Sequence, residues 1–142
     1  MVTYTDSLES ISASELYGFF DGWPNPPSPS VHLELLRNSY EIVLALDEQT
    51  GQVVGFVAAI SDGVLSAYIS FLEVLPAYQD QGVGQELMRR MLEKLQGLYM
   101  VDLLCDSELQ NYYAQFGMRT ANGMMLRNYD RQSGPKCVKE TR

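Results

Sequence analysis

Residues 72–85, with the sequence LEVLPAYQDQGVGQ, constrain the fold of this chain more than any other stretch. A strand-like apolar run ends at Pro76, and a turn containing Gly82 and Gly84 then opens a segment of different period. The apolar residues of that segment recur every four positions, as on one face of an amphipathic helix: Val83, Leu87, Met91 and Leu95. The sequence therefore predicts a strand, a glycine turn and a long helix in direct succession.

Three strands are predicted before this helix, over residues 40–46, 52–60 and 64–75. The turn-forming sequences DEQTG and SDG separate them. Connections this short join antiparallel neighbours, so we expect an antiparallel meander. Residues 2–5 alternate β-branched and polar side chains and predict a short edge strand.

The N-terminal region carries the signals of two helices separated by a rigid loop. Ser12 and Glu15 form a capping box, which predicts a first short helix. The loop, residues 22–29, contains four of the six prolines. Ser28 provides the N-cap of a second helix that ends near Asn38.

The C-terminal half adds further elements. Residues 99–104 predict a buried strand. Ser107 and Gln110 form a second capping box, and the helix that they open stops at the C-cap residue Gly117. Residues 124–127 predict a last short strand.

Length and charge narrow the classes of protein. The 142 residues suit one globular domain, which we place at residues 1–128, followed by a polar C-terminal tail at 129–142. The net charge of -8 disfavours nucleic acid as a partner, because phosphates would be repelled. The longest apolar run, residues 53–60, is too short to span a bilayer. We therefore expect a cytoplasmic protein that does not bind membranes.

Cysteine and histidine usage predicts neither a disulfide nor a metal site. Cys105 follows an apolar run, whereas Cys137 lies in the polar tail, so the two are not expected to pair. The single histidine, His32, is expected at the surface or as a capping residue. No paired Cys/His spacing is present, and no metal is expected.

The turn around Gly82 and Gly84 has the properties of an anion site. Backbone N–H groups at a helix start have no intrahelical partner and lie at the positive end of the helix dipole. Glycines let a phosphate approach them closely, although glycines also begin helices for steric reasons alone. A dinucleotide fingerprint would need a glycine at Leu87, and a P-loop would need Gly-Lys-Ser/Thr; both are excluded.

Two motifs resemble those of the GNAT acetyltransferase superfamily. The first is its acetyl-CoA signature Gln/Arg-x-x-Gly-x-Gly/Ala, matched by Gln79, Gly82 and Gly84 after Leu-x-Val-x-Pro-x-Tyr. The second is Phe-Tyr-x-x-x-Gly-Phe, matched by Tyr112, Tyr113, Gly117 and Met118. The predicted order of elements is similar to that of the family as far as about residue 129.

The resemblance implies an α/β (α+β) fold, with a mixed, mostly antiparallel central sheet flanked by helices and with strands four and five splayed apart. It implies acetyl-CoA as the acetyl donor. The pantetheine arm would pair with the backbone of Leu72, Glu73 and Val74 in the gap between strands four and five. The pyrophosphate would lie on the amides of the glycine turn: Gln79, Asp80, Gln81, Gly82, Val83, Gly84 and Gln85.

Acetyl transfer from a thioester to an amine needs a stabilised oxyanion and a proton for the departing thiolate. The resemblance implies that the backbone N–H of Leu72 stabilises the oxyanion. It also implies that Tyr113, in contact with the cofactor, donates the proton to the thiolate. A phenol with a pKa near 10 stays protonated at neutral pH and can protonate a thiolate whose pKa is about 8.5. The alternative for Tyr113 is an aromatic packed under the sheet, a role that suits Tyr112 better.

The sequence does not identify the base that deprotonates the amine. Relatives often place a base at the positions of Tyr68 or Ser70, and neither residue is a good base. The amine could instead lose its proton through a water chain or to a base from the first two helices, or its own pKa could be lowered. Because side chains alternate along a strand, Glu73 is expected on one face and four other residues on the opposite face: Tyr68, Ser70, Leu72 and Val74. Glu73 is therefore expected to be solvated or salt-bridged, unless a bulge reverses its face.

The acceptor site in this family lies between the first two helices, where Phe20 and Trp23 either wall the substrate pocket or form a hydrophobic plug. Tyr68 and Ser70 are the other residues expected on the substrate side. We expect an N-acetyltransferase in which a primary amine, either a small cationic amine or a peptide amine, attacks the thioester directly. The alternatives are a non-catalytic acetyl-CoA-binding sensor and an interaction domain. A monomer and a homodimer fit equally well.

Overall fold

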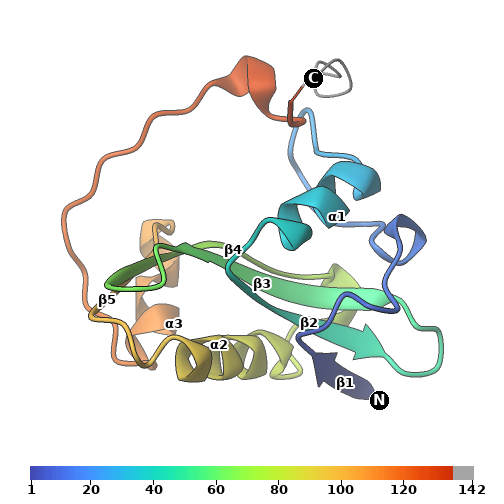
Figure 1. Ribbon diagram of the computed structural model, residues 1–142, viewed down its shortest axis with the longest axis horizontal. Coiled ribbons are helices and arrows are strands. Elements are labelled where there is room, and N and C mark those ends of the chain that lie inside the picture. Colours follow the sequence, from blue (N-terminus) through green and yellow to red (C-terminus); the bar gives the residue numbers. More distant parts are fainter. Residues whose placement is uncertain (136–142) are drawn as a thin grey trace.

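The computed structural model describes residues 1–135 and contains a five-stranded sheet with helices on both faces (Figure 1). The strands are β1 (Val2–Thr5), β2 (Glu41–Asp47), β3 (Val53–Ser61), β4 (Ser66–Val74) and β5 (Met100–Asp102). The helices are α1 (Pro29–Arg37), α2 (Val83–Lys94) and α3 (Gln110–Ala114). Helix α1 lies on one face of the sheet, and α2 and α3 lie on the other (Figure 1).

The strands are ordered β1-β2-β3-β4-β5 across the sheet. The first three pairings are antiparallel and the last, between β4 and β5, is parallel. The predicted meander and the mixed, mostly antiparallel sheet flanked by helices are confirmed. Short turns join β2, β3 and β4, whereas the parallel step to β5 crosses over through α2, as a parallel pairing requires.

Helix α2 packs on β3 through the apolar stripe that its sequence predicts. Val83, Leu87, Met91 and Leu95 are all buried. Gly55 on β3 makes this close packing feasible, because a Cβ there would lie 3.1 Å from Leu87 Cδ1. The helix is thereby fixed against the centre of the sheet, and its N-terminus is fixed with it.

Helix α1 begins as expected, with Ser28 Oγ accepting a hydrogen bond from Val31 N at 3.2 Å. The expectation for His32 is wrong, because its side chain is only 1% exposed. Its ring lies among Phe19, Phe20 and Phe56, with centroid distances of 5.3, 5.0 and 4.3 Å. Within residues 1–135 neither ring nitrogen has a hydrogen-bond partner, and burial lowers the pKa of His32 to about 4.

The first predicted helix is reduced to a 3-10 turn at Ala13–Glu15. Its capping box is present, with Ser12 N donating to Glu15 Oε1 at 2.7 Å. The helix does not continue because Gly18 and Phe20 adopt left-handed backbone conformations, with φ of +92° and +63°. The chain instead turns repeatedly and buries aromatic side chains against the sheet.

The region around β5 differs from the prediction in two ways. The strand covers only Met100–Asp102 of the expected 99–104 and is largely exposed, because it pairs with β4 on one edge alone. The predicted serine cap of the next helix is absent, and a 3-10 turn at Ser107–Leu109 precedes α3 instead. Gly117 ends that helical region with φ of +90°, as expected for a C-cap glycine.

Residues 119–128, here named the C-terminal arm, form no strand, so the strand predicted at 124–127 is wrong. A strand needs a neighbour for its backbone hydrogen bonds, and the arm instead runs as an open arch from α3 toward α1 (Figure 1). After the arm, the chain is held near α1, where Asn25 N donates to Gln132 Oε1 at 2.9 Å. Cys105 is a free, half-buried thiol, and Cys137 lies outside the described residues.

Candidate active site

Strands β4 and β5 diverge after three residue pairs. Ser66, Ala67 and Tyr68 pair with Met100–Asp102, and within residues 1–135 no strand pairs with this edge of β4 beyond Tyr68. The rest of β4, as far as Val74, therefore borders an open gap. This is the splay of the fourth and fifth strands that the GNAT resemblance implies.

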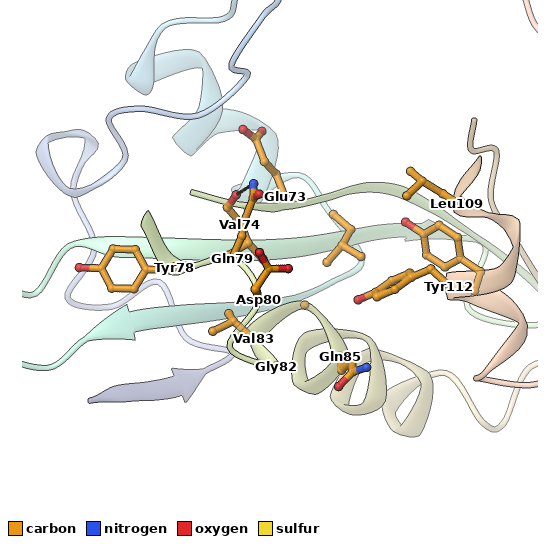
Figure 2. Close-up of a pocket in the computed structure, with 13 residues that line it drawn as sticks. Glu73, Val74, Tyr78, Gln79, Asp80, Gly82, Val83, Gln85, Leu109 and Tyr112 are labelled. Atoms are coloured by element: carbon orange, nitrogen blue, oxygen red, sulfur yellow. Dashed lines mark hydrogen bonds between the residues drawn. The ribbon is translucent and has the colours of Figure 1, made fainter. Parts of the chain in front are cut away.

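The gap contains a cavity of about 680 Å³ between the end of β4, the glycine turn and α3 (Figure 2). Its lining is formed by Leu72, Glu73, Val74, Tyr78, Gln79, Asp80, Gly82, Val83, Gly84, Gln85, Leu109, Tyr112 and Tyr113. Of the residues expected to hold a cofactor, Gln81 alone does not line it. The Gln81 side chain donates to the Ala77 carbonyl at 3.3 Å.

Three residues of the lining were not expected from the sequence. Tyr78 belongs to the strand-to-turn motif, and its hydroxyl donates to Asp47 Oδ2 at 2.6 Å, which fixes the turn to the end of β2. Leu109 and Tyr112 come from the region of α3. Tyr112 matches the second family motif, but nothing in a single sequence states which side of a short helix faces the gap.

The backbone of β4 presents donors to the cavity. Leu75 N donates to Val54 O on β3 at 2.8 Å. Because backbone groups alternate in direction along a strand, the N–H groups of Leu72 and Val74 point away from β3 and into the gap. The Val74 carbonyl accepts a hydrogen bond from Gln79 Nε2 at 2.9 Å, which ties the turn to the end of the strand.

The glycine turn leaves its backbone open. Gly82 is the N-cap of α2 with φ of +82°, and Asp80 also adopts a left-handed conformation with φ of +63°. The first bond of the helix runs from Glu86 N to Gly82 O at 3.1 Å. The N–H groups of residues 83–85 therefore have no partner within the helix and are positioned for an anion.

Gly84 is held close to the tyrosine on α3. A Cβ at this position would lie 2.8 Å from Tyr112 Oη and 3.7 Å from Val74 Cγ2. The Tyr112 hydroxyl therefore lies directly over the first turn of α2 (Figure 2). Only glycine leaves room for this approach.

Tyr112 and Tyr113 both face the cavity, with ring centroids 5.1 Å apart in an edge-to-face arrangement. Tyr113 is the one that also packs against the core, contrary to the expectation that Tyr112 fills that role. Burial, with smaller contributions from Tyr112 and Cys105, raises the pKa of Tyr113 to about 12. Its hydroxyl is therefore a protonated donor at neutral pH.

A β-bulge at Ser70 reverses the alternation of side chains along β4. Phe71 pairs with Ala58 and Ile69 with Ala59, so Ser70 is the extra residue. The expectation that Tyr68 shares a face with Leu72 is wrong, because the extra residue moves Tyr68 to the face of Glu73. The Ser70 hydroxyl donates to Ala58 O at 3.4 Å, and neither Tyr68 nor Ser70 lines the cavity.

Glu73 lies on the face opposite Leu72, as its parity predicts, and extends toward the side of α1 (Figure 2). Its side chain is half-buried and, within residues 1–135, forms no salt bridge, whereas the sequence favours a solvated or salt-bridged carboxylate. Its carboxylate accepts from Phe20 N at 2.9 and 3.0 Å and from Asp21 N at 3.4 Å. Burial raises the pKa of Glu73, against the opposing effect of these two backbone hydrogen bonds.

Phe20 and Trp23 lie over β4 beside Glu73. Phe20 is only 3% exposed, so its ring is part of the core and not the wall of an open pocket. Trp23 is 38% exposed and contacts both Phe20 and Phe71, with centroid distances of 4.9 and 6.4 Å. Of the two predicted wall residues, Trp23 is therefore the one available to a ligand.

A family model gives the decisive comparison. The model of the acetyltransferase (GNAT) family matches residues 7–118, which contain the splayed strands, the glycine turn and both tyrosines. The chain belongs to the GNAT acetyltransferase family. The GNAT resemblance seen in its two motifs is confirmed, and the family as a whole transfers acetyl groups.

Solved structures of GNAT proteins share this fold. The chain is similar to a putative acetyltransferase from Deinococcus radiodurans R1, with 45% identity, 96% and 94% of the two chains covered and a TM-score of 0.92. It is also similar to a GNAT family acetyltransferase from Streptococcus pneumoniae TIGR4, with 28% identity, 90% and 98% covered and a TM-score of 0.73.

Curated GNAT relatives are more distant. The chain is 27% identical over 114 residues to GCN5-related N-acetyltransferase 1, chloroplastic, of Arabidopsis thaliana. The match covers 78% of this chain and 58% of that relative, so this chain spans little more than half the length of the plant protein.

Two further features bear on partners. In the part of the chain that the structure describes, no helix has both the length and the apolar character needed to cross a bilayer. The same residues contain no group of three or more His, Cys, Asp or Glu side chains that could hold a metal ion. The cytoplasmic location expected from the sequence stays a prediction.

Proposed function

We propose that this GNAT protein is an acetyl-CoA-dependent N-acetyltransferase that acts on a primary amine. The observation that carries the proposal is the gap beside β4, which has free N–H groups of a helix start at one end and a protonated tyrosine in its wall. Such a gap offers hydrogen-bond donors to an extended ligand and a proton to a leaving group.

The residues of the cavity fit acetyl-CoA. The backbone at Gly82 is open, since the nearest atom to a Cβ there would be Gln85 Oε1 at 4.0 Å. A pyrophosphate would be held by the N–H groups of residues 83–85, and the pantetheine amides would pair with the gap-facing backbone of Leu72 and Val74. When bound, acetyl-CoA supplies an activated acetyl group as a thioester.

The chain's own groups support direct transfer. The Leu72 N–H points into the gap and donates to the thioester oxygen as negative charge develops there. The Tyr113 hydroxyl donates its proton to the departing sulfur. Because the pKa of Tyr113 is raised to about 12, the hydroxyl is protonated and available as a donor at neutral pH.

Glu73 is the residue best suited to receive the proton of the amine. It lines the cavity and lies on the same face of β4 as Phe71, against which the loop residue Trp23 packs. Two backbone N–H groups fix the orientation of its carboxylate, and burial raises its pKa toward the range of an effective base. Glu73 is therefore our candidate for the base that the sequence alone does not identify.

The acceptor is proposed to be a small cationic amine or a peptide amine. The Asp21 carboxylate lies close enough to Glu73 to contribute to its raised pKa, and the partly exposed ring of Trp23 packs on the same cluster as Phe71. An aromatic face and negative charge both attract an ammonium group. The net charge of -8 steers cations toward the surface in the same way.

The first experiment measures thermal unfolding with and without acetyl-CoA, with ATP and NAD as controls. A ligand at a hundredfold excess over its dissociation constant stabilises the native state by about 2.7 kcal/mol, which raises the Tm by several degrees in a domain of this size. Amines are then screened for release of the free thiol. A shift with acetyl-CoA followed by amine-dependent thiol release supports the proposal.

Other outcomes contradict it in different ways. A shift without thiol release for any class of amine would favour the non-catalytic sensor. The absence of any shift at saturating acetyl-CoA would remove the basis for both functions.

A further inference from the structure

The imidazole of His32 is a buried titratable group that the proposed chemistry leaves unused. Within residues 1–135 neither of its ring nitrogens has a hydrogen-bond partner. Its backbone N–H makes the first hydrogen bond of α1, to Ser28 O at 2.9 Å, so the residue lies in the first turn, at the positive end of the helix dipole. The apolar surroundings and the dipole both oppose a positive charge on this ring.

Aromatic rings enclose the His32 side chain, and two of them come from the loop that precedes α1. The edge-to-face contacts with Phe19 and Phe20 have centroid distances of 5.3 and 5.0 Å, and Phe56 on β3 lies at 4.3 Å. Phe20 in turn contacts Trp23, with a centroid distance of 4.9 Å. The loop therefore packs on the sheet partly through the neutral ring of His32.

Residues 18–23, here named the acceptor loop because they border the proposed acceptor site, have few other attachments. Within residues 1–135, the hydrogen bonds that join this loop to the sheet are those that Glu73 accepts from Phe20 N and Asp21 N. Phe20, at the centre of the loop, has φ of +63°, which costs free energy for a bulky residue. The closed position of the loop therefore depends on how its rings pack.

No charged group on the neighbouring elements offsets a proton on His32. β3 contributes no titratable residue. On α1, Glu34 and Arg37 lie two and five positions after His32, and therefore on other faces of the helix. Burial alone accounts for the lowered pKa of His32. None of the titratable side chains on the surrounding segments contributes to it: Glu15, Tyr17, Asp21, Glu34, Arg37 and Glu73.

We propose that His32 is a positioning residue for acetyl transfer: its neutral ring holds the acceptor loop over Glu73, and a proton on the ring releases the loop. This inference rests on the proposed function, because it concerns the acceptor side of that site. Neutral His32 favours the closed loop fully above about pH 6.5, and this effect is lost as the pH falls toward about 4. Over that range the equilibrium shifts toward the open loop by up to about 300-fold.

Glu73 acts in the opposite direction. Its pKa is raised while the acceptor loop covers it, so a proton on Glu73 favours the closed loop. Opening of the loop in acid is therefore a property of His32 and not of the carboxylate that the loop contacts.

The test uses Trp23, the single tryptophan of the chain, as a reporter of the loop. Its fluorescence is titrated in the full-length protein from about pH 8 to about pH 4, with far-UV circular dichroism measured on the same samples. We expect a reversible change in Trp23 emission with a midpoint between pH 6.5 and 4. The dichroism should be retained, because α2 packs on the opposite face of the sheet from α1 (Figure 1).

Variants identify the group that titrates. His32→Phe keeps an aromatic ring that cannot take a proton, so the emission change should disappear; His32→Leu should behave in the same way. Asp21→Asn and Glu73→Gln remove the two carboxylates of this region, and the change should remain in both. An emission change that persists without His32, or one that is lost with either carboxylate, would overturn the proposal.

A kinetic measurement separates positioning from stability. As the pH is lowered from about 8 to about 5.5, the KM for the amine should rise more steeply in the wild type than in His32→Phe. The dissociation constant of acetyl-CoA should stay within about twofold in both, because the glycine turn lies on the other side of the sheet. Equal slopes of KM, no emission change above about pH 4, or a change that coincides with loss of dichroism would each contradict the role of His32. The fluorescence result needs no turnover, so it is independent of a failure of the proposed function.

Discussion

The carboxylate of Glu73 accepts two hydrogen bonds from the backbone N–H of Phe20, at 2.9 and 3.0 Å, across 53 positions of sequence. Phe20 has φ of +63°, a conformation that costs free energy for a bulky residue. The contact therefore joins a strained loop residue to the middle of the candidate active site. It fixes the orientation of the Glu73 carboxylate and connects the loop around Phe20 to the strand that borders the cavity.

Replacing Glu73 by Gln should separate catalysis from cofactor binding. The amide keeps the size of the side chain but cannot take a proton from the amine, so we expect kcat to fall by at least about a hundredfold. The dissociation constant of acetyl-CoA should stay within about twofold, since that ligand meets the other face of β4. Steady-state thiol release and calorimetric titration measure the two quantities.

The same variant tests the pH dependence. A base acts when deprotonated, so wild-type activity should fall as the pH drops through the raised pKa of Glu73. Glu73→Gln should lose this acidic limb. An unchanged limb in the variant would assign the base to another group.

Replacing Gly82 by Val should weaken acetyl-CoA binding while the fold is retained. A β-branched residue disfavours the left-handed conformation that this turn requires, by about 1–2 kcal/mol. We expect the dissociation constant to rise at least about tenfold. Gly51→Val is the matched control, because Gly51 has φ of +77° in the turn between β2 and β3 and no atom within 4 Å of its Cβ position. A similar loss of affinity in both variants would show a general effect on stability.

Replacing Tyr113 by Phe should slow release of the thiol by about a hundredfold without changing acetyl-CoA affinity, because the hydroxyl acts on the leaving group. With its pKa raised to about 12, Tyr113 should contribute no basic limb to the activity profile below about pH 10. Tyr112→Phe removes the neighbouring hydroxyl and serves as the comparison. Equal losses in the two variants would contradict a specific role for Tyr113.

Replacing His32 by Leu should flatten the dependence of stability on pH. The folded protein keeps His32 neutral down to about pH 4, whereas the unfolded chain protonates it near 6.5. The contribution of neutral His32 to the free energy of unfolding is therefore fully present above about pH 6.5. It is lost as the pH falls toward 4, by about 3 kcal/mol in total. Urea unfolding at pH 7.5 and pH 5 measures this. If the free energies of unfolding of the wild type and the variant differ by the same amount at both pH values, the lowered pKa of His32 does not contribute to the pH dependence.

Local patterns in the sequence predicted much of the fold and part of the site. The stripe of α2, the cap at Ser28 and the glycine turn depend on residues near one another, so a single sequence contains them. The motif around Gly82 and the Tyr112–Tyr113 pair indicated the family, because both are patterns of residues that are close in the sequence. The splay of β4 from β5 followed from that family and not from any residue pattern.

Long-range contacts account for the errors. The sequence could not indicate that Phe20 would bind Glu73 or that Phe56 would enclose His32, since each pair meets only in the folded chain. The bulge at Ser70 left no local signal, and it moved Tyr68 to the other face of the strand. The arm had the apolar content of a strand but no neighbour within the described chain with which to pair.

The connection between Glu73 and Phe20 also bears on how acceptor preference can change during evolution. The lining of the cavity comes mainly from two compact stretches, 72–85 and 109–113, whereas the proposed acceptor side depends on the loop with Phe20, Asp21 and Trp23, which contacts β4 at Glu73 and Phe71. Substitutions or length changes in that loop can alter which amine is admitted while the donor cleft stays intact. One anchored loop thus gives the scaffold a means of diversifying its substrates without having to rebuild its chemistry.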